Sequence, residues 1–184
     1  MVLEICIDSI ESVKNAVNGG ANRLEICSSL SEGGLTPTLG LINFTKQYTN
    51  IPIYSMIRIR SGNFNYTQEE IDAMIYDLKL LKNHNVDGFV FAARPKPVTF
   101  HRAFDEVDEP FIALNEIINL GFERILTSGK KNTAIEGIEL IKQLVEKADD
   151  KIIIMPGSGI TCDNISLIKN STGAKEFHAS AKIT

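Results

Sequence analysis

Two stretches of the chain place a carboxylate and a thiol two residues apart. Glu4 precedes Cys6 at this spacing, and Glu25 precedes Cys27. Side chains two residues apart lie on one face of a β-strand, so each pair points to one side of an extended segment. Carboxylates serve in acid–base chemistry, and thiols in a chain of this kind are unpaired or bind metal. The repeat predicts that two strands bring these groups to one face.

Basic side chains recur with the same parity on other apolar stretches. Arg58 and Arg60 share a face, His101 lies in Thr-Phe-His-Arg-Ala-Phe-Asp at the end of a predicted strand, and His178 lies in the last apolar stretch. Buried charges persist only when they are paired or hydrogen-bonded. If these faces point inward, they form either a functional site or a structural layer of charges, and the sequence leaves both interpretations open.

Two glycine-containing loops add potential backbone donors. Ser128-Gly129 and Gly157-Ser158-Gly159 each follow a predicted strand, and a helix is predicted to begin shortly after the second loop. Backbone N–H groups and a helix N-terminus can bind a phosphate or carboxylate, although glycines also serve simply as tight turns. We therefore expect a small anionic ligand with Glu25 or His101 as general acid or base. The residues expected to bind it are Arg58, Arg60, His101, Ser128, Gly157 and His178.

These residues require a scaffold of alternating strands and helices. Stretches typical of β-strands cover residues 2–7, 23–28, 52–58, 88–93, 98–103, 124–128, 152–156 and 176–181. Helical patterns cover residues 9–18, 38–48, 67–84, 110–120, 133–147 and 161–170. Thr67 and Glu70 have the spacing of a capping box, and Gly121 is a helix stop. The alternation predicts an α/β fold, a TIM-type (β/α)8 barrel, as a single domain over residues 1–184.

This predicted barrel is short of the usual size. Residues 94–97 alone separate the fourth and fifth strands, whereas a parallel crossover normally takes a dozen residues or more. We therefore expect a barrel that lacks the helix between strands 4 and 5 and any helix after strand 8, incomplete around residues 93–97 and at the C-terminus. We expect such a gap to expose residues such as Phe89, Phe91 or Phe100, so that the chain either folds poorly or self-associates into a homo-oligomer.

Composition excludes several classes of protein. The 184 residues carry a formal net charge of -4 and no basic run, which predicts no nucleic-acid partner. No apolar run approaches the ~18 residues of a membrane span, and no basic leader precedes an apolar stretch. We expect a cytoplasmic protein without a membrane partner. Its 3 cysteines are then thiols or metal ligands, since disulfides rarely persist in a reducing compartment.

Taken together, the motifs resemble those of the CutC family. They are Glu-Ile-Cys-Ile-Asp-Ser from Glu4, Gly-Gly-Ala-Asn-Arg-Leu-Glu-Ile-Cys-Ser from Gly19, Leu-Ser-Glu-Gly-Gly-Leu-Thr-Pro-Thr from Leu30, Met-Ile-Arg-Ile-Arg-Ser-Gly-Asn-Phe from Met56, Val-Thr-Phe-His-Arg-Ala-Phe-Asp from Val98, Leu-Thr-Ser-Gly from Leu126, Met-Pro-Gly-Ser-Gly-Ile from Met155 and Glu-Phe-His-Ala-Ser-Ala from Glu176. They follow one another in order over nearly the whole chain. The chain departs from the family in Ile59 for Pro, in Ser158 for Gly, in the absent segment after the fourth strand and in a short tail.

The resemblance implies a barrel fold and a role in copper homeostasis. Cu(I) favours thiolate and thioether ligands. Cys6 and Cys27 occupy equivalent positions on adjacent predicted strands, with Met56 in a similar position on the third, so we expect Cys6 and Cys27 to bind copper(I). Buried cysteines also act as small hydrophobic residues. The alternative function is a barrel enzyme that acts on a small anionic substrate, and the sequence does not decide whether the protein is an enzyme.

Overall fold

The structure, a computed structural model, describes residues 1–90 and 98–180. Its strands are β1 (Val2–Ile7), β2 (Arg23–Ile26), β3 (Ile53–Met56), β4 (Gly88–Val90), β5 (Val98–Phe100), β6 (Arg124–Thr127), β7 (Ile153–Pro156) and β8 (Glu176–Ser180). Its α-helices are α1 (Ile10–Asn18), α2 (Leu39–Tyr48), α3 (Gln68–Asn83), α4 (Pro110–Leu120), α5 (Ile138–Ala148) and α6 (Ile165–Thr172). The predicted alternation is confirmed over these residues.

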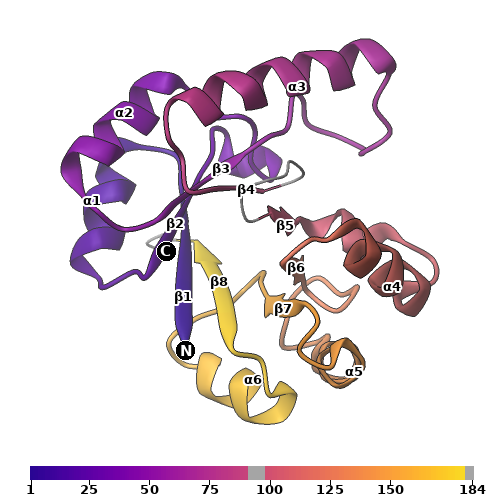
Figure 1. Ribbon diagram of the computed structural model, residues 1–184. Helices are drawn as coiled ribbons and strands as arrows, with labels where there is room; N and C mark the ends of the chain where they lie inside the picture. Colours follow the sequence, from indigo (N-terminus) through magenta and orange to yellow (C-terminus); the bar gives the residue numbers. More distant parts are fainter. Residues whose placement is uncertain (91–97, 181–184) are drawn as a thin grey trace. The chain divides into compact units, whose positions relative to one another are not determined.

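The chain divides into two compact units. Unit 1 comprises Met1–Glu4 and Val98–Ser180, and unit 2 comprises Ile5–Pro97 and Ala181–Thr184. In unit 2 the strands follow the order β4, β3, β2, β1, and β2, β3 and β4 pair in parallel. Helices α1, α2 and α3 connect these strands and lie on one side of them (Figure 1). This arrangement gives the strands of unit 2 one helix-covered face and one opposite face.

Alternating residues of unit 2 separate onto these two faces. Leu24 and Ile26 pack in a cluster with Val13, Ile42 and Met74 of the helices. A separate cluster contains Cys6, Cys27, Tyr54, Met56 and Val90, with Leu30 packed against it. The period of two therefore places the cysteines on the face opposite the helices, as the sequence predicts.

Local signals set the ends of several helices. Thr67 caps α3 by accepting from the backbone N–H of Glu70, and the Glu70 carboxylate accepts in turn from the N–H of Thr67. This is the predicted capping box. Helix α4 begins with Pro110 and ends before Gly121, whose φ of 77° is the left-handed conformation that glycine adopts without steric cost. Local sequence therefore fixes helix limits independently of the tertiary fold.

Unit 1 repeats the parallel arrangement. Strand β6 pairs in parallel with β5 and with β7, and β8 packs against β7. Its outer core joins residues of α4, α5 and α6 to the strands, including Leu114, Ile141, Ile168 and Ile125. On the opposite face, Arg124 of β6 donates to Glu176 of β8 over 2.8 Å. This ion pair identifies the inward face of unit 1.

Several elements are shorter than the sequence pattern predicts. Strand β5 ends at Phe100 and is followed by a 3-10 helix over Arg102–Glu106, because Ala103 donates back to the His101 ring and closes a turn. Helix α5 begins at Ile138, after turns that cover the predicted start at residue 133. The predicted residues 91–93 of the fourth strand, the linker 94–97 and residue 181 lie outside the described residues.

The expectation that Phe89 is uncovered is wrong. Phe89 is 1% exposed and belongs to the cluster that contains Met74 and Leu81 of α3. Phe100 is partly buried and meets Phe122 edge-on, with ring centroids 5.3 Å apart. Neighbouring elements of each residue's own unit therefore cover these rings.

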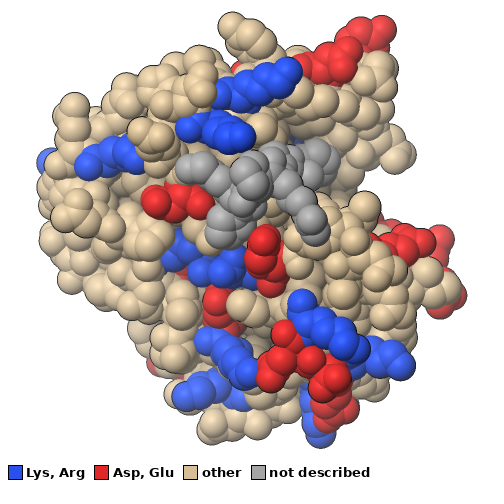
Figure 2. Space-filling model, in the orientation of Figure 1, with Lys and Arg blue, Asp and Glu red and all other residues tan. Residues whose placement is uncertain are grey.

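Over the described residues, no helix combines the length and the apolar character that crossing a bilayer requires. Acidic and basic side chains are interspersed on the face drawn in Figure 2. The mixture agrees with the nearly balanced composition of 19 basic and 23 acidic residues, which gives a formal net charge of -4. On that face, charge is mixed over the described surface.

Candidate functional site

The two predicted cysteine ligands are adjacent in unit 2. Cys6 lies in β1 and Cys27 directly follows β2, where its backbone N–H donates to the carbonyl of Ile7 over 3.0 Å. This strand-to-strand bond brings the two Sγ atoms to 3.4 Å. Both side chains are buried, and they are not joined by a disulfide. The predicted proximity of the two thiols is confirmed.

A glycine turn closes over these sulfur atoms. Gly34 has φ of 88°, and a Cβ at this position would lie 3.2 Å from Met56 Cε and 3.6 Å from Cys27 Sγ. Only glycine combines this backbone conformation with such close approach. We call Cys6, Cys27 and Met56 the sulfur cluster. It offers two thiols and a neighbouring thioether in an apolar setting with Tyr54 and Val90.

Arg58 holds the turn over the sulfur cluster. Its Nη1 donates to the carbonyls of Glu32 (2.8 Å) and Gly34 (3.3 Å), and its Nη2 donates to that of Gly62 (2.9 Å). The guanidinium also lies 4.9 Å from the centroid of the Phe64 ring. The buried cation is therefore solvated by carbonyl dipoles and an aromatic face, and it ties two loops together.

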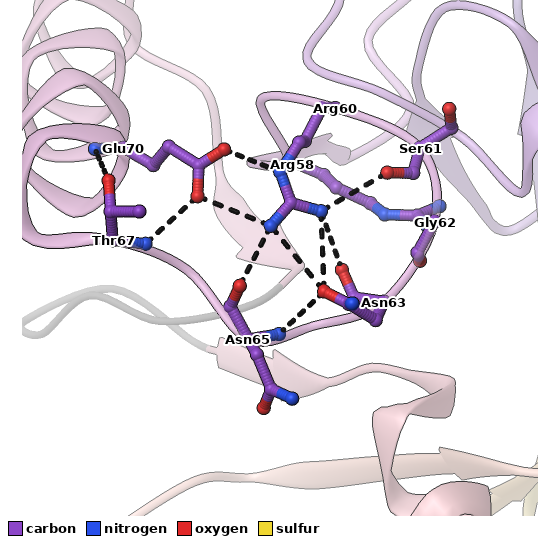
Figure 3. Close-up of polar contacts among 8 residues, drawn as sticks. All are labelled: Arg58, Arg60, Ser61, Gly62, Asn63, Asn65, Thr67 and Glu70. Carbon is purple, nitrogen blue, oxygen red and sulfur yellow. Dashed lines mark hydrogen bonds and ion pairs between the residues drawn. The ribbon is translucent and has the colours of Figure 1, made fainter.

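Arg60 forms a second, more exposed junction (Figure 3). Its Nε and Nη2 donate to the two carboxylate oxygens of Glu70, over 2.5 and 3.2 Å, and Nη2 also donates to the Asn65 carbonyl over 2.7 Å. The hydrogen bond from Arg60, followed by that from the Thr67 N–H, lowers the pKa of Glu70. The same carboxylate raises the pKa of Arg60. Arg60 thus joins the loop before α3 to the first turn of that helix.

Glu25 completes the predicted residues of unit 2. It lies in β2, is 1% exposed, and shares strand parity with Cys27. The carboxylate therefore occupies the face that carries the sulfur cluster.

In unit 1, Asp105 organises the end of β6. Its Oδ1 accepts from Thr127 Oγ1 (2.5 Å) and from the N–H of Lys130 (3.1 Å), and its Oδ2 accepts from Arg102 Nε (2.8 Å). Ser128 donates to the same carboxylate through its N–H and its hydroxyl, both over 3.1 Å to Oδ2. Ser128, predicted to bind a ligand, is thus engaged with Asp105. Sequence reasoning missed Asp105, although it ends the quoted motif that contains His101.

Two imidazoles lie on the inner side of unit 1. His178 Nδ1 is 2.8 Å from Oε1 of Glu4, which is fully buried. His101 is also buried, and its Nδ1 accepts from the Ala103 N–H over 2.9 Å. Gly157 lies next to His178, since a Cβ at position 157 would lie 3.3 Å from His178 Cβ. The chain therefore places His101, Gly157 and His178 in unit 1.

Comparison with known protein families shows the family to which this chain belongs. The sequence model of the CutC family matches residues 1–96 and 89–183. This chain belongs to the CutC family. The copper homeostasis protein cutC homolog of Homo sapiens is 47% identical over 202 aligned positions, which cover 100% of this chain and 74% of the relative. A CutC family protein of Parabacteroides distasonis is 45% identical, over 98% of this chain and 83% of the relative.

Solved structures agree with the CutC assignment. The crystal structure of a putative copper homeostasis protein CutC from Streptococcus agalactiae superposes with a TM-score of 0.91 at 31% identity, over 97% of this chain and 98% of that one. Thiamine phosphate pyrophosphorylase from Pyrococcus furiosus superposes with a TM-score of 0.61 at 15% identity, over 98% of this chain and 85% of that one. The second likeness shows the fold alone. The fold is of the predicted TIM type, with eight parallel strands and intervening helices.

Proposed function

We propose that this chain is a copper homeostasis protein that binds Cu(I) through Cys6 and Cys27. The observation that carries the proposal is the 3.4 Å separation of the two Sγ atoms. Thiolates are the ligands that Cu(I) prefers, and two sulfur atoms this close can bind one ion with small side-chain movement. The human and mouse relatives are named copper homeostasis protein cutC homologs, and their names support a copper-related function for this chain.

The surroundings of the sulfur cluster support this proposal. Two thiols that bind Cu(I) release two protons, so the ion with two thiolates carries a net negative charge. Arg58 Nη1 lies 3.0 Å from the position of a Cβ on Gly33, and Gly34 is in contact with the sulfur cluster. The buried Arg58 guanidinium, which donates to the carbonyls of this turn, opposes that negative charge. The apolar neighbours Tyr54 and Val90 exclude water from the thiolates.

Anaerobic competition against a chromophoric Cu(I) chelator tests the proposal. We expect wild-type protein to withdraw about one Cu(I) ion per chain, and Cys6→Ser and Cys27→Ser each to lose this capacity, since soft thiolates bind Cu(I) where hydroxyls do not. Cys162→Ser is the matched control, because Cys162 is the exposed cysteine. Copper retained by the double variant Cys6→Ser, Cys27→Ser would overturn the assignment of these ligands.

A second candidate function is that of a barrel enzyme acting on a small anionic substrate. The observation that favours it is the pair of buried imidazoles in unit 1, of which His101 follows β5 and His178 lies in β8. Of the residues that we expected to bind an anion, Arg58, Arg60 and Ser128 have carbonyl or carboxylate partners within the fold. His101 and His178 also have partners, the Ala103 N–H and the Glu4 carboxylate. The second candidate keeps His101, His178 and Gly157 of unit 1 as ligand-binding residues with His101 as general acid or base, and Glu25, the other candidate for that role, belongs to unit 2.

Screening by calorimetry against inorganic phosphate and acetate tests this second candidate. We expect phosphate to bind wild-type protein and His101→Ala to weaken that binding while the melting temperature changes little. Unaltered affinity in His101→Ala would refute the role of this residue.

We also infer that the chain is a single (β/α)8 domain that lacks a βα segment around residues 93–97. The two stretches matched by the family model meet at residues 89–96, and the human relative aligns over 202 positions against 184 residues here. Inserting the corresponding segment of the human relative should raise the melting temperature and reduce self-association in light scattering. An insertion that lowers stability would contradict the inference.

We expect the protein to act in the cytoplasm and to form a homo-oligomer. Buried thiols that are not joined by a disulfide suit a reducing compartment. Cell fractionation with an antibody to the native protein tests the location, and light scattering after gel filtration tests the oligomer. Recovery from the secreted fraction, or a monomeric mass at micromolar concentration, would contradict these expectations.

A further inference from the structure

We propose that helix α3 pairs two copies of this chain, with the two α3 helices antiparallel and related by a two-fold axis. The helix spans Gln68–Asn83 and lies wholly in unit 2. The inference rests on the expectation of a homo-oligomer stated above, and it names both the surface and the partner, which is a second copy of this chain. It is independent of copper binding by the sulfur cluster.

Helix α3 presents apolar side chains to solvent as well as to the core. Met74 and Leu81 are buried in the core of unit 2. On the adjoining side of the helix, Ile71 and Ile75 are 37% and 43% exposed, and Leu78 is partly buried. Apolar residues that recur at intervals of four and three residues form a continuous seam to which a second helix can pack. We call Ile71, Ile75 and Leu78 the α3 seam.

Opposite charges lie along one flank of the α3 seam. Asp72 and Lys79 are both exposed and are one heptad apart, so they lie on nearly the same side of the helix. Glu69 is in the first turn of α3 and Lys82 is in the last. Figure 2 shows acidic side chains over one end of α3 and basic side chains nearer the other. The exposed part of this helix is therefore acidic towards its start and basic towards its end.

This charge pattern is complementary to itself when the helix is reversed. In an antiparallel pair related by a two-fold axis, the same flank of each helix adjoins, and the two flanks run in opposite directions. Asp72 and Lys79 are equally distant in sequence from the midpoint between Ile75 and Tyr76. Reversal about that point brings Asp72 of each copy level with Lys79 of the other copy, and it places Ile75 near the axis.

A parallel pair lacks this complementarity. In a parallel pair, each flank adjoins the opposite flank of the second helix, so Asp72 and Lys79 do not meet. Charges beside a helix seam set partner choice and orientation, and two-fold symmetric dimers are the commonest oligomers. The charges of α3 therefore favour a second, antiparallel copy of the same helix.

The size of the surface indicates a reversible dimer. A helix of 16 residues is about 24 Å long. A pair of such helices buries less than the ~1,200 Å² that stable complexes usually bury, so we expect association in the micromolar range. Two-fold symmetry places every contact in the interface twice, and one substitution therefore changes two contacts.

Sedimentation equilibrium of the full chain over the micromolar range tests the proposal. Asp72→Lys and Lys79→Asp should each weaken self-association about tenfold or more, because two attractive contacts become repulsive. Glu11→Lys is the matched control, since it makes the same change of charge at an exposed position in the first turn of another helix of unit 2. The control should associate as the wild-type protein does.

An equimolar mixture of Asp72→Lys and Lys79→Asp identifies the orientation. One copy then carries two lysines at these positions and the other carries two aspartates, so an antiparallel pair regains both attractive contacts. We expect the mixture to form a dimer with nearly the affinity of wild-type protein. The double variant Asp72→Lys, Lys79→Asp should likewise regain self-association, since its two charges are exchanged.

Replacing Ile75 by Ser tests the apolar part of the interface without changing charge. Two isoleucines then lose apolar burial, so we expect self-association to weaken about tenfold. The substituted positions are exposed, and each variant should retain the wild-type melting temperature in circular dichroism.

Each outcome decides a separate statement. Self-association that is unaffected by Asp72→Lys, Lys79→Asp and Ile75→Ser would overturn the assignment to α3, while the expectation of a homo-oligomer would stand. Weakened variants whose mixture stays monomeric would refute the antiparallel arrangement. Wild-type protein that stays monomeric throughout the micromolar range would refute both the inference and the homo-oligomer.

Discussion

Replacing Arg58 by Met should destabilise the fold and loosen the turn over the sulfur cluster. Methionine retains much of the aliphatic stem but removes the guanidinium that donates to three backbone carbonyls. Hydrogen bonds from a charged donor each contribute about 1.5–3 kcal/mol. Part of this lost free energy is recovered wherever a carbonyl released by Arg58 becomes hydrogen-bonded to water.

The local exposure indicates which of these bonds matter most. Glu32 and Gly62 are exposed, so their carbonyls can be hydrated in the variant, whereas Gly34 is buried and its carbonyl loses its donor. One uncompensated bond, together with the contact to the Phe64 ring, amounts to about 2–4 kcal/mol. For a chain of this size, we expect the melting temperature to fall by about 4–16 °C.

Thermal unfolding followed by circular dichroism measures this effect, with Arg60→Met as the matched control. The Arg60 and Glu70 side chains are 36% and 24% exposed, so water replaces much of what their ion pair supplies. We expect the control to lose less than half as much in melting temperature. Equal losses in both variants would refute the structural role assigned to Arg58. An unchanged melting temperature with lost anion binding would instead restore the ligand-binding role that the sequence predicts.

Three further predictions concern single residues. Asp105→Asn should lower the free energy of unfolding, measured by urea titration, by about 3 kcal/mol, because the amide cannot accept from every donor around this buried position. A loss below 1 kcal/mol, about the net contribution of one hydrogen bond, would contradict this prediction. Gly34→Ala should cost about 1–2 kcal/mol from its positive φ and weaken Cu(I) binding, and unaltered values in both assays would refute the close approach. The pKa of Glu70 is lowered in the folded protein, so its stabilising effect is present above the unfolded pKa of about 4.3 and is lost as pH falls through the lower folded pKa. Glu70→Gln should therefore unfold with a shallower dependence on pH below about 4.3, and superimposable pH profiles would exclude this linkage.

The sequence predicts elements best where the signal is local. The capping box of Thr67 and Glu70 and the helix stop at Gly121 lie where expected, because these signals act within one turn of chain. The predicted strand over residues 98–103 is too long, because the hydrogen bond from the Ala103 N–H to the His101 ring ends β5 at Phe100. Phe89 was expected to be uncovered, and α3 packs over it because apolar surface finds cover within its own unit.

The sequence by itself determined the class of fold and the face on which each reactive residue lies. Strand periodicity is a property of the backbone, so the inward parity of Glu25, Cys6 and Cys27 follows from spacing alone. The tertiary structure alone decided what these and other side chains contact. Thr127 lies 22 positions from Asp105, Gly34 lies 24 from Arg58, and Glu4 lies 174 from His178. Such contacts depend on how strands and loops assemble, because hydrogen bonds form between groups close in space whatever their separation along the chain.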